Sequence, residues 1–144
     1  MSAYLDALVA FFEALSPADV ERFDRFYTPD AHFVDPFNEV RGVPAIAAIF
    51  RHMFAQLDEP RFVVSGRFEQ AGQAVLLWSL HCRLAGRAVE IPGASHLRFA
   101  DDGRVCAHRD FWDAASGVYE HLPLLGGLMR CARHRLSAPQ ARRR

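Results

Sequence analysis

The chain has 144 residues, of which 51% are hydrophobic and 24% charged, and its formal net charge is zero. This composition excludes a disordered chain, because so many apolar residues with so little net charge can bury a core. The length is typical of one domain. No apolar run reaches the roughly 18 residues that a membrane span needs, and residues 1–6 lack the basic start of a secretory signal. We therefore expect a soluble, cytoplasmic protein.

All 17 basic residues are arginine, which excludes a lysine Schiff base and a lysine-containing phosphate loop. The balanced charge argues against nucleic-acid binding. The cysteines have no zinc-binding spacing and are expected to be reduced thiols, at Cys82, Cys106 and Cys131. The histidines have no metal-binding spacing either. We expect neither a metal nor a cofactor.

The first part of the chain has the apolar spacing of helices, which are predicted over residues 3–15, 16–27 and 44–57. The second helix has a clear start, because Ser16 is a good N-cap, Pro17 suits the first helical position and Asp19 completes a capping box. A short extended stretch is expected over residues 31–35, before the third helix.

From residue 61 onward the apolar residues alternate, and strands are predicted over 61–70, 73–84, 88–100 and 104–113. Asp101-Asp102-Gly103 is a strong hairpin signal between the last two strands. Helices followed by antiparallel hairpins indicate the α+β class. The strands are apolar on both faces, so we expect the helices to cover one face of the sheet. A second copy of the chain would cover the outer face, which predicts a homodimer.

The end of the chain is expected to be an extension, so the predicted division is 1–121 and 122–144. Residues 114–136 are predicted to be helical in pieces, interrupted at Pro123 and Gly126-Gly127. The extension is amphipathic and basic, with six arginines and no acidic residue in the last fifteen positions. Two interpretations are open, namely contact with an anionic membrane surface and packing on the domain or its dimer mate. We favour packing, because aromatic anchors are absent.

Three stretches carry a resemblance to a known family. They are FYTPDAHFVDP over residues 26–36, GVPAIAAIFRHMF over 42–54 and SHLRFADDGRV over 95–105. In this order they resemble the nuclear transport factor 2-like superfamily, which includes ketosteroid isomerases and SnoaL-like polyketide cyclases. The resemblance covers residues 3–113. It implies a cone, in which a curved antiparallel sheet packs against N-terminal helices, here with an extra C-terminal helix.

The resemblance also suggests site residues. Ketosteroid isomerases use an Asp before Pro on the first strand as general base, and Asp35 resembles it. Their two oxyanion donors match Phe11 and Ser95 here, and because a Phe cannot donate, a conventional steroid isomerase is not expected. SnoaL-like cyclases use an Asp on the last strand as acid and base, and Asp110 resembles that residue.

The residues themselves leave alternatives open at both aspartates. Asp35 is either a base whose pKa is raised by nearby aromatic rings, or a residue that ends a strand in a turn. Asp110 lies in the middle of a predicted strand, where Asp is disfavoured and needs a partner. His108 and Trp112 share its face by the period of two. His108 either orients Asp110 and moves a proton, or is simply its structural partner.

These observations support two hypotheses. The first is an enzyme that binds a small apolar molecule, with a ring as one option, and moves protons in an isomerisation, cyclisation or dehydration. Asp35, Asp110 and His108 would be catalytic, one carboxyl remaining protonated while the other acts as base. The residues expected to bind the ligand are Phe11, Phe33, Phe50, Phe54, Trp78, Ser95, Phe99 and Trp112. The second hypothesis is a non-catalytic homodimer that binds ligands or serves as a scaffold.

Overall fold

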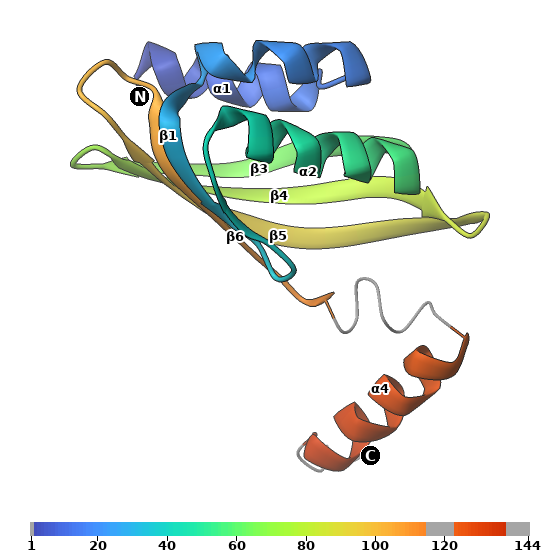
Figure 1. Ribbon diagram of the computed structural model, residues 1–144. Coiled ribbons are helices and arrows are strands. Elements are labelled where there is room, and N and C mark those ends of the chain that lie inside the picture. The colour runs from blue at the N-terminus through green and yellow to red at the C-terminus, as the bar shows by residue number, and fades with distance from the viewer. Residues whose placement is uncertain (1, 115–122, 138–144) are drawn as a thin grey trace. The chain divides into compact units, whose positions relative to one another are not determined.

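The computed structural model describes residues 2–114 and 123–137 (Figure 1). Contacts divide the chain into two units, Met1–Trp112 and Asp113–Arg144. The first unit has the predicted α+β fold, with helices packed against a curved, six-stranded sheet. In the described part of the chain no helix is long and apolar enough to cross a membrane.

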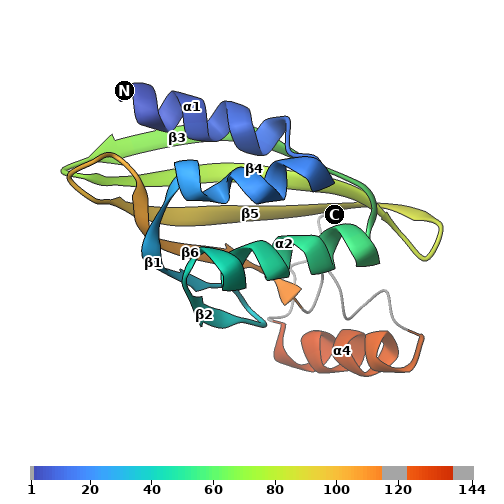
Figure 2. The ribbon, with the colours of Figure 1, turned by 45° about the horizontal axis from the view of Figure 1, so that its top comes forward.

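The helices begin where the sequence indicates. Helix α1 spans Ala3–Glu13 and α2 spans Val43–Gln56. The second predicted helix is a 3₁₀ helix, η1, over Pro17–Arg25, and the capping box is present, with the Ser16 backbone N–H donating to Asp19 Oδ2 at 2.9 Å. This helix ends earlier than predicted, because Tyr27 already belongs to the first strand. Figure 2 shows α1 and α2 lying across the same face of the sheet.

The sheet has the strand order β2-β1-β6-β5-β4-β3. The strands are β1 (Tyr27–Val34), β2 (Glu39–Arg41), β3 (Asp58–Gln70), β4 (Gln73–Leu84), β5 (Arg87–Phe99) and β6 (Val105–Trp112). The four predicted strands are confirmed as β3 to β6, whereas the three-residue β2 was not predicted. All neighbouring strands are antiparallel except β1 and β6, which are parallel.

The alternation predicted for the strands is confirmed and determines which side chains face the helices. On β4 the buried residues are Ala74, Leu76, Trp78, Leu80 and Cys82. Ser95 and Leu97 on β5 are buried as well, and they pair with Asp110 and His108 of β6. The inner face of the sheet therefore carries a few polar groups inside an apolar layer.

In the second unit, α4 spans Pro123–Leu136 without a break. The predicted interruption at Gly126-Gly127 is wrong. A glycine inside a helix costs only about 1 kcal/mol relative to alanine, and proline is tolerated in the first turn, where its missing N–H has no intrahelical partner. Residues 115–122, part of the stretch predicted to be helical in pieces, and residues 138–144 at the end of the predicted extension lie outside the described residues.

Two hairpin glycines have a left-handed backbone but different surroundings. Gly72, between β3 and β4, has φ +74°, and a Cβ there would meet nothing within 4 Å. Gly103, between β5 and β6, has φ +85°, and a Cβ there would overlap the ring of Tyr4 on α1. The second glycine therefore permits both the turn and the close approach of the helix.

We predict that Gly72→Ala lowers the free energy of unfolding by about 1 kcal/mol, the cost of a left-handed alanine. Gly103→Ala is expected to lower it by about 3 kcal/mol, because overlap with Tyr4 is added to the backbone cost. Urea denaturation of both variants measures the difference. Equal losses would show that Tyr4 moves aside at no cost and that this contact does not restrict the helix.

Candidate functional site

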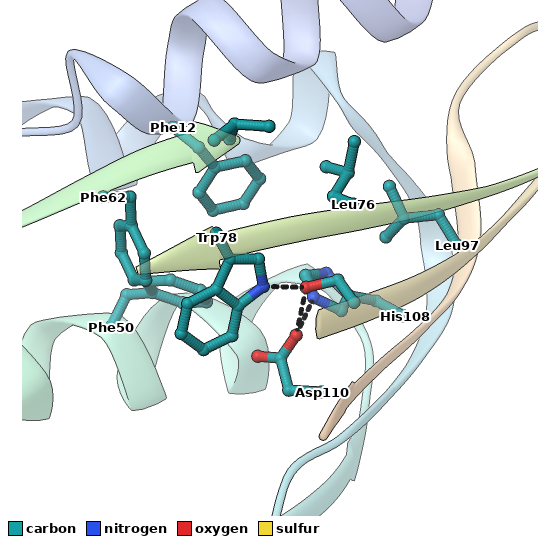
Figure 3. A pocket seen from close by; sticks show the side chains of 10 residues that line it. Phe12, Phe50, Phe62, Leu76, Trp78, Leu97, His108 and Asp110 are labelled. Atoms are coloured by element: carbon teal, nitrogen blue, oxygen red, sulfur yellow. Dashed lines mark hydrogen bonds and ion pairs between the residues drawn. The ribbon is translucent and has the colours of Figure 1, made fainter. Parts of the chain in front are cut away.

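Five polar side chains on the inner face of the sheet form one hydrogen-bonded chain. Figure 3 shows the part of this chain that runs from Trp78 to Asp110 and His108. Trp78 Nε1 lies 2.8 Å from Ser95 Oγ, which lies 2.5 Å from Asp110 Oδ1. His108 Nε2 lies 2.7 Å from the same Asp110 oxygen, and His108 Nδ1 lies 2.7 Å from the hydroxyl of Tyr27. Strands β1, β4, β5 and β6 all contribute to the chain.

The chemistry of the donors fixes the direction of this chain. An indole nitrogen can only donate, so Ser95 accepts a hydrogen bond from Trp78 and donates its own hydroxyl hydrogen bond to Asp110. With Asp110 ionised and His108 neutral, His108 donates from Nε2 to the carboxylate, and its Nδ1 accepts from the Tyr27 hydroxyl. Two donor arms therefore converge on the single oxygen Oδ1 of Asp110.

The chain is buried except at its carboxylate. The exposed fractions are 0% for Tyr27, 5% for His108 and 15% for the Asp110 side chain. Burial raises the pKa of Tyr27 well above its usual value, and the charge of Asp110 raises it further. Tyr27 therefore stays a donor at neutral pH.

The second oxygen of Asp110, Oδ2, is the free position of the site. Among the described residues no hydrogen bond reaches it. It is not a buried atom without a partner either, because among the described residues Thr28 Oγ1 is the only such atom. Asp110 Oδ2 therefore reaches accessible space, and a bound molecule could interact with it.

Asp110 lies at the wall of a small inner cavity of about 30 Å³. The cavity is otherwise mostly apolar and is lined by Phe12, Phe50, Phe62, Val64, Leu76, Trp78, Ser95, Leu97, His108 and Asp110. For comparison, an apolar cavity that binds benzene measures roughly 150 Å³. With the side chains as they stand, the inner cavity is therefore too small for a ring-containing molecule.

Asp110 also lines an open outer groove of about 640 Å³. The other residues that line this groove are Val34, Asp35, Pro36, Arg109, Phe111 and Trp112. Of the described residues, Asp110 alone lines both spaces. Asp110 therefore borders both the apolar interior and the groove.

Asp35 lies in the groove, but its carboxylate forms a turn. Its Oδ1 accepts from the backbone N–H groups of Phe37 and Asn38, both at 2.7 Å. The side-chain amide of Asn38 lies 3.1 Å from each carboxylate oxygen. The turn that the sequence left open is thus the local geometry, and a role for Asp35 as base stays a prediction.

The predicted ligand-binding residues separate into three groups. Phe50, Trp78 and Ser95 line the inner cavity, and Trp112 lines the outer groove. The others line neither space, and of these Phe11 and Phe33 belong to the buried core. The remaining two are Phe54 and Phe99.

Sequence reasoning missed Tyr27 of the polar chain and five residues that line the inner cavity, namely Phe12, Phe62, Val64, Leu76 and Leu97. Phe62 could have been found, because it lies on the same strand face as Val64, at the predicted alternation. Tyr27 gave no such signal, since it reaches His108 through the parallel pairing of β1 with β6, 81 residues apart in sequence.

Among residues 2–114 and 123–137 no group of three or more His, Cys, Asp or Glu side chains is placed to hold a metal ion.

A curved sheet with helices packed against one face is the arrangement of the nuclear transport factor 2-like fold. Residues 8–108 match the SnoaL-like domain, so the protein belongs to the SnoaL-like domain family. No curated protein matches the chain.

Solved structures confirm the fold. An NTF2-like protein of unknown function from Burkholderia pseudomallei has a TM-score of 0.72 at 21% identity, covering 81% of this chain and 95% of its own. A proposed polyketide cyclase from Acidithiobacillus ferrooxidans has a TM-score of 0.70 at 21% identity, covering 85% and 97%. A protein with a ketosteroid isomerase-like fold from Catenulispora acidiphila, in complex with trimethylamine, has a TM-score of 0.70 at 13% identity, covering 82% and 91%. Such identities show a shared fold alone.

The buried Tyr27 predicts a loss of stability in alkali. Its folded-state pKa is raised, so its contribution to stability is complete below pH 10 and falls as pH rises toward the folded value. The free energy of unfolding should fall by up to about 1.4 kcal/mol per pH unit in this range. Tyr27→Phe should remove this fall, although at pH 7 it costs about 1–3 kcal/mol by leaving His108 Nδ1 unpaired.

Urea denaturation between pH 8 and 11 (roughly one unit or more on each side of the ordinary tyrosine pKa) checks this prediction. Tyr4→Phe is the control, because Tyr4 is 59% exposed. Parallel pH profiles for the wild type and Tyr27→Phe would contradict the assignment.

Proposed function

We propose that this protein binds a small, largely apolar molecule at Asp110 and catalyses proton transfer on it. The ligand would lie in the outer groove, with its reacting part directed toward the inner cavity. This places an enzyme of the isomerase, cyclase or dehydratase type on the SnoaL-like fold.

One observation carries the proposal, namely the unequal environment of the two Asp110 oxygens. Oδ1 is held by Ser95 and His108, while Oδ2 has no partner among the described residues and reaches accessible space. A base held by one oxygen presents the other in a defined position, which is the positioning that general base catalysis requires.

The proposed step is a transfer of one proton. Asp110 Oδ2 takes a proton from an acidic C–H of the ligand, and the electron pair of that bond stays on the ligand as a delocalised anion. The carboxylic acid so formed returns the proton to a different atom of the ligand, which completes an isomerisation or starts a cyclisation. His108 and Ser95 keep their hydrogen bonds to Oδ1 throughout.

The same hydrogen bonds restrict the class of substrate. The Ser95 hydroxyl donates a hydrogen bond to Asp110, and the Trp78 N–H donates one to Ser95, so neither donor is directed at the ligand. The other position that corresponds to an oxyanion donor of ketosteroid isomerases is occupied by Phe11, which cannot donate a hydrogen bond. Without an oxyanion hole an isolated enolate loses its main stabilisation. The substrate we propose is therefore a carbon acid that delocalises its own anion, such as a 1,3-dicarbonyl compound.

Deuterium exchange tests this role. In D₂O the wild type should accelerate hydrogen–deuterium exchange at the central carbon of small 1,3-dicarbonyl compounds. The exchange is measured by ¹H NMR. Asp110→Asn should lower the protein-dependent rate by about 100-fold or more, in the range of general base catalysis. Asp30→Asn, which removes an exposed carboxylate of β1, should leave the rate unchanged.

Asp35→Asn distinguishes the mechanisms in the same assay. We expect a rate within about threefold of the wild type (about 0.65 kcal/mol or less in barrier height), because the amide oxygen can still form the turn. A loss as large as that of Asp110→Asn would instead support the paired-carboxylate mechanism. Absence of exchange in every protein would contradict the proposal.

A second candidate is a non-catalytic homodimer, and the outer face of the sheet favours it. Five of the exposed large apolar residues lie on this face, at Val63, Phe68, Val75, Leu77 and Phe111. The row of paired positions Gly66, Leu77, Ala94 and Phe111 crosses four strands without a charge. A contiguous apolar patch of this kind is typical of an interface, and we propose a second copy as its partner.

Leu77→Glu tests the dimer. A charge in the middle of the patch should shift the protein to a monomer, measured by sedimentation velocity at micromolar concentration. Ala55→Glu, on the exposed side of α2, should keep the oligomeric state of the wild type. A monomeric wild type, or a dimer that Leu77→Glu does not weaken, would contradict the interface.

A further inference from the structure

The indole of Trp78 is held in one pose by the absence of a side chain on the next strand. Trp78 on β4 pairs with Gly93 on β5. A Cβ at Gly93 would overlap three ring carbons of the indole, Cζ2, Cζ3 and Cη2. The ring therefore lies flat over the backbone of β5, where no other residue type leaves room for it.

A hydrogen bond at the other edge of the ring completes this pose. Trp78 Nε1 donates to Ser95 Oγ at 2.8 Å, and Ser95 lies two residues beyond Gly93 on the same strand. The ring of Phe62 meets the indole edge-on, with centroids 5.6 Å apart and an interplanar angle of 88°. The indole is only 8% exposed, although it borders a cavity (Figure 3).

The pose determines how much space the cone contains. With the indole over Gly93, the inner cavity has about 30 Å³, which suits one or two water molecules. An indole is larger than benzene, so its removal would leave an apolar space on the scale of the roughly 150 Å³ that holds benzene. Asp110 already lies at the wall of this space.

We propose that Trp78 is the specificity-determining residue of the site. Held by Gly93 and Ser95, its indole excludes ring-sized molecules from the inner cavity, and only the small reacting part of a ligand enters. This inference rests on the proposed function only in taking the inner cavity as the space that the reacting part of the ligand enters. The position of the indole also accounts for the small volume of the inner cavity, about 30 Å³.

Removal of the indole tests the size limit directly. Indole and benzene serve as probes, and binding is measured by calorimetry and by the shift in melting temperature of the full chain. Trp78→Ala should bind each probe with one-to-one stoichiometry, and saturating probe should raise its melting temperature by about 2 °C or more. The wild type should show neither binding nor a shift. Trp78→Phe, which fills part of the space, should bind indole more weakly than Trp78→Ala.

The pose itself is tested by adding a methyl group. Gly93→Ala should displace the indole and break the bond to Ser95, so exchange of the Trp78 Nε1 proton should become at least about tenfold faster, which corresponds to about 1.4 kcal/mol. Gly66→Ala is the matched control, because it adds the same methyl group to the outer face beside Leu77, away from the cavity. Equal exchange rates in Gly93→Ala and the wild type would overturn the role of Gly93.

Three outcomes decide the proposal. Ring probes that bind only when Trp78 is shortened support it. Binding of indole to the wild type with Trp78 Nε1–H exchange unchanged would overturn it, and so would a folded Trp78→Ala that binds neither probe. If Trp78→Ala does not fold, benzene is tested on Trp78→Phe instead. Binding then supports the proposal, and no binding overturns it. Repeating the measurements in Asp110→Asn separates this inference from catalysis, since neutral probes need no carboxylate.

Discussion

A carboxylate in the middle of an apolar strand face is the constraint on which the rest of this structure depends. Asp110 would be costly there without donors, and it receives two on one oxygen. Those donors are themselves held by Trp78 and Tyr27, so strands β1, β4, β5 and β6 must all keep their register. A slip of one residue would turn each polar side chain to the other face of the sheet. The polar chain thus specifies the alignment of the strands as well as the chemistry of the site.

Local patterns in the sequence predicted most of the fold. The capping box at Ser16, the alternation along β4 and the face shared by His108 and Asp110 depend on residues close in sequence, and all are confirmed. The three-residue strand β2 and the role of Tyr27 depend on pairing with distant segments, which no local pattern records. Gly126-Gly127 shows the opposite case, where a local signal was weaker than the helix around it.

The lining of the cavity was only partly predictable for a different reason. Phe11 and Phe12 are neighbours on α1, yet only Phe12 borders the cavity. Phe11 is buried and stacks on Phe26, with the two ring centroids 4.3 Å apart. Periodicity identifies which side of an element is apolar, but an empty space exists only where the side chains of several elements fail to meet. That outcome is set by the shapes of all of them together. The glycine opposite Trp78 is one such shape, and it carries no pattern of its own.

The parallel pairing of β1 with β6 also has a consequence for how the protein is made. Strand β6 is the last strand of the first unit, and Tyr27 meets His108 across 81 residues of chain. Closing such a long loop is slow, because its entropy is lost before the contacts form. During synthesis every other strand leaves the ribosome before β6, so Tyr27 remains without its partner until the final strand is added. Because β6 lies between β1 and β5 in the sheet, a chain that stops before β6 can neither join β1 and β2 to the other strands nor supply His108 and Asp110.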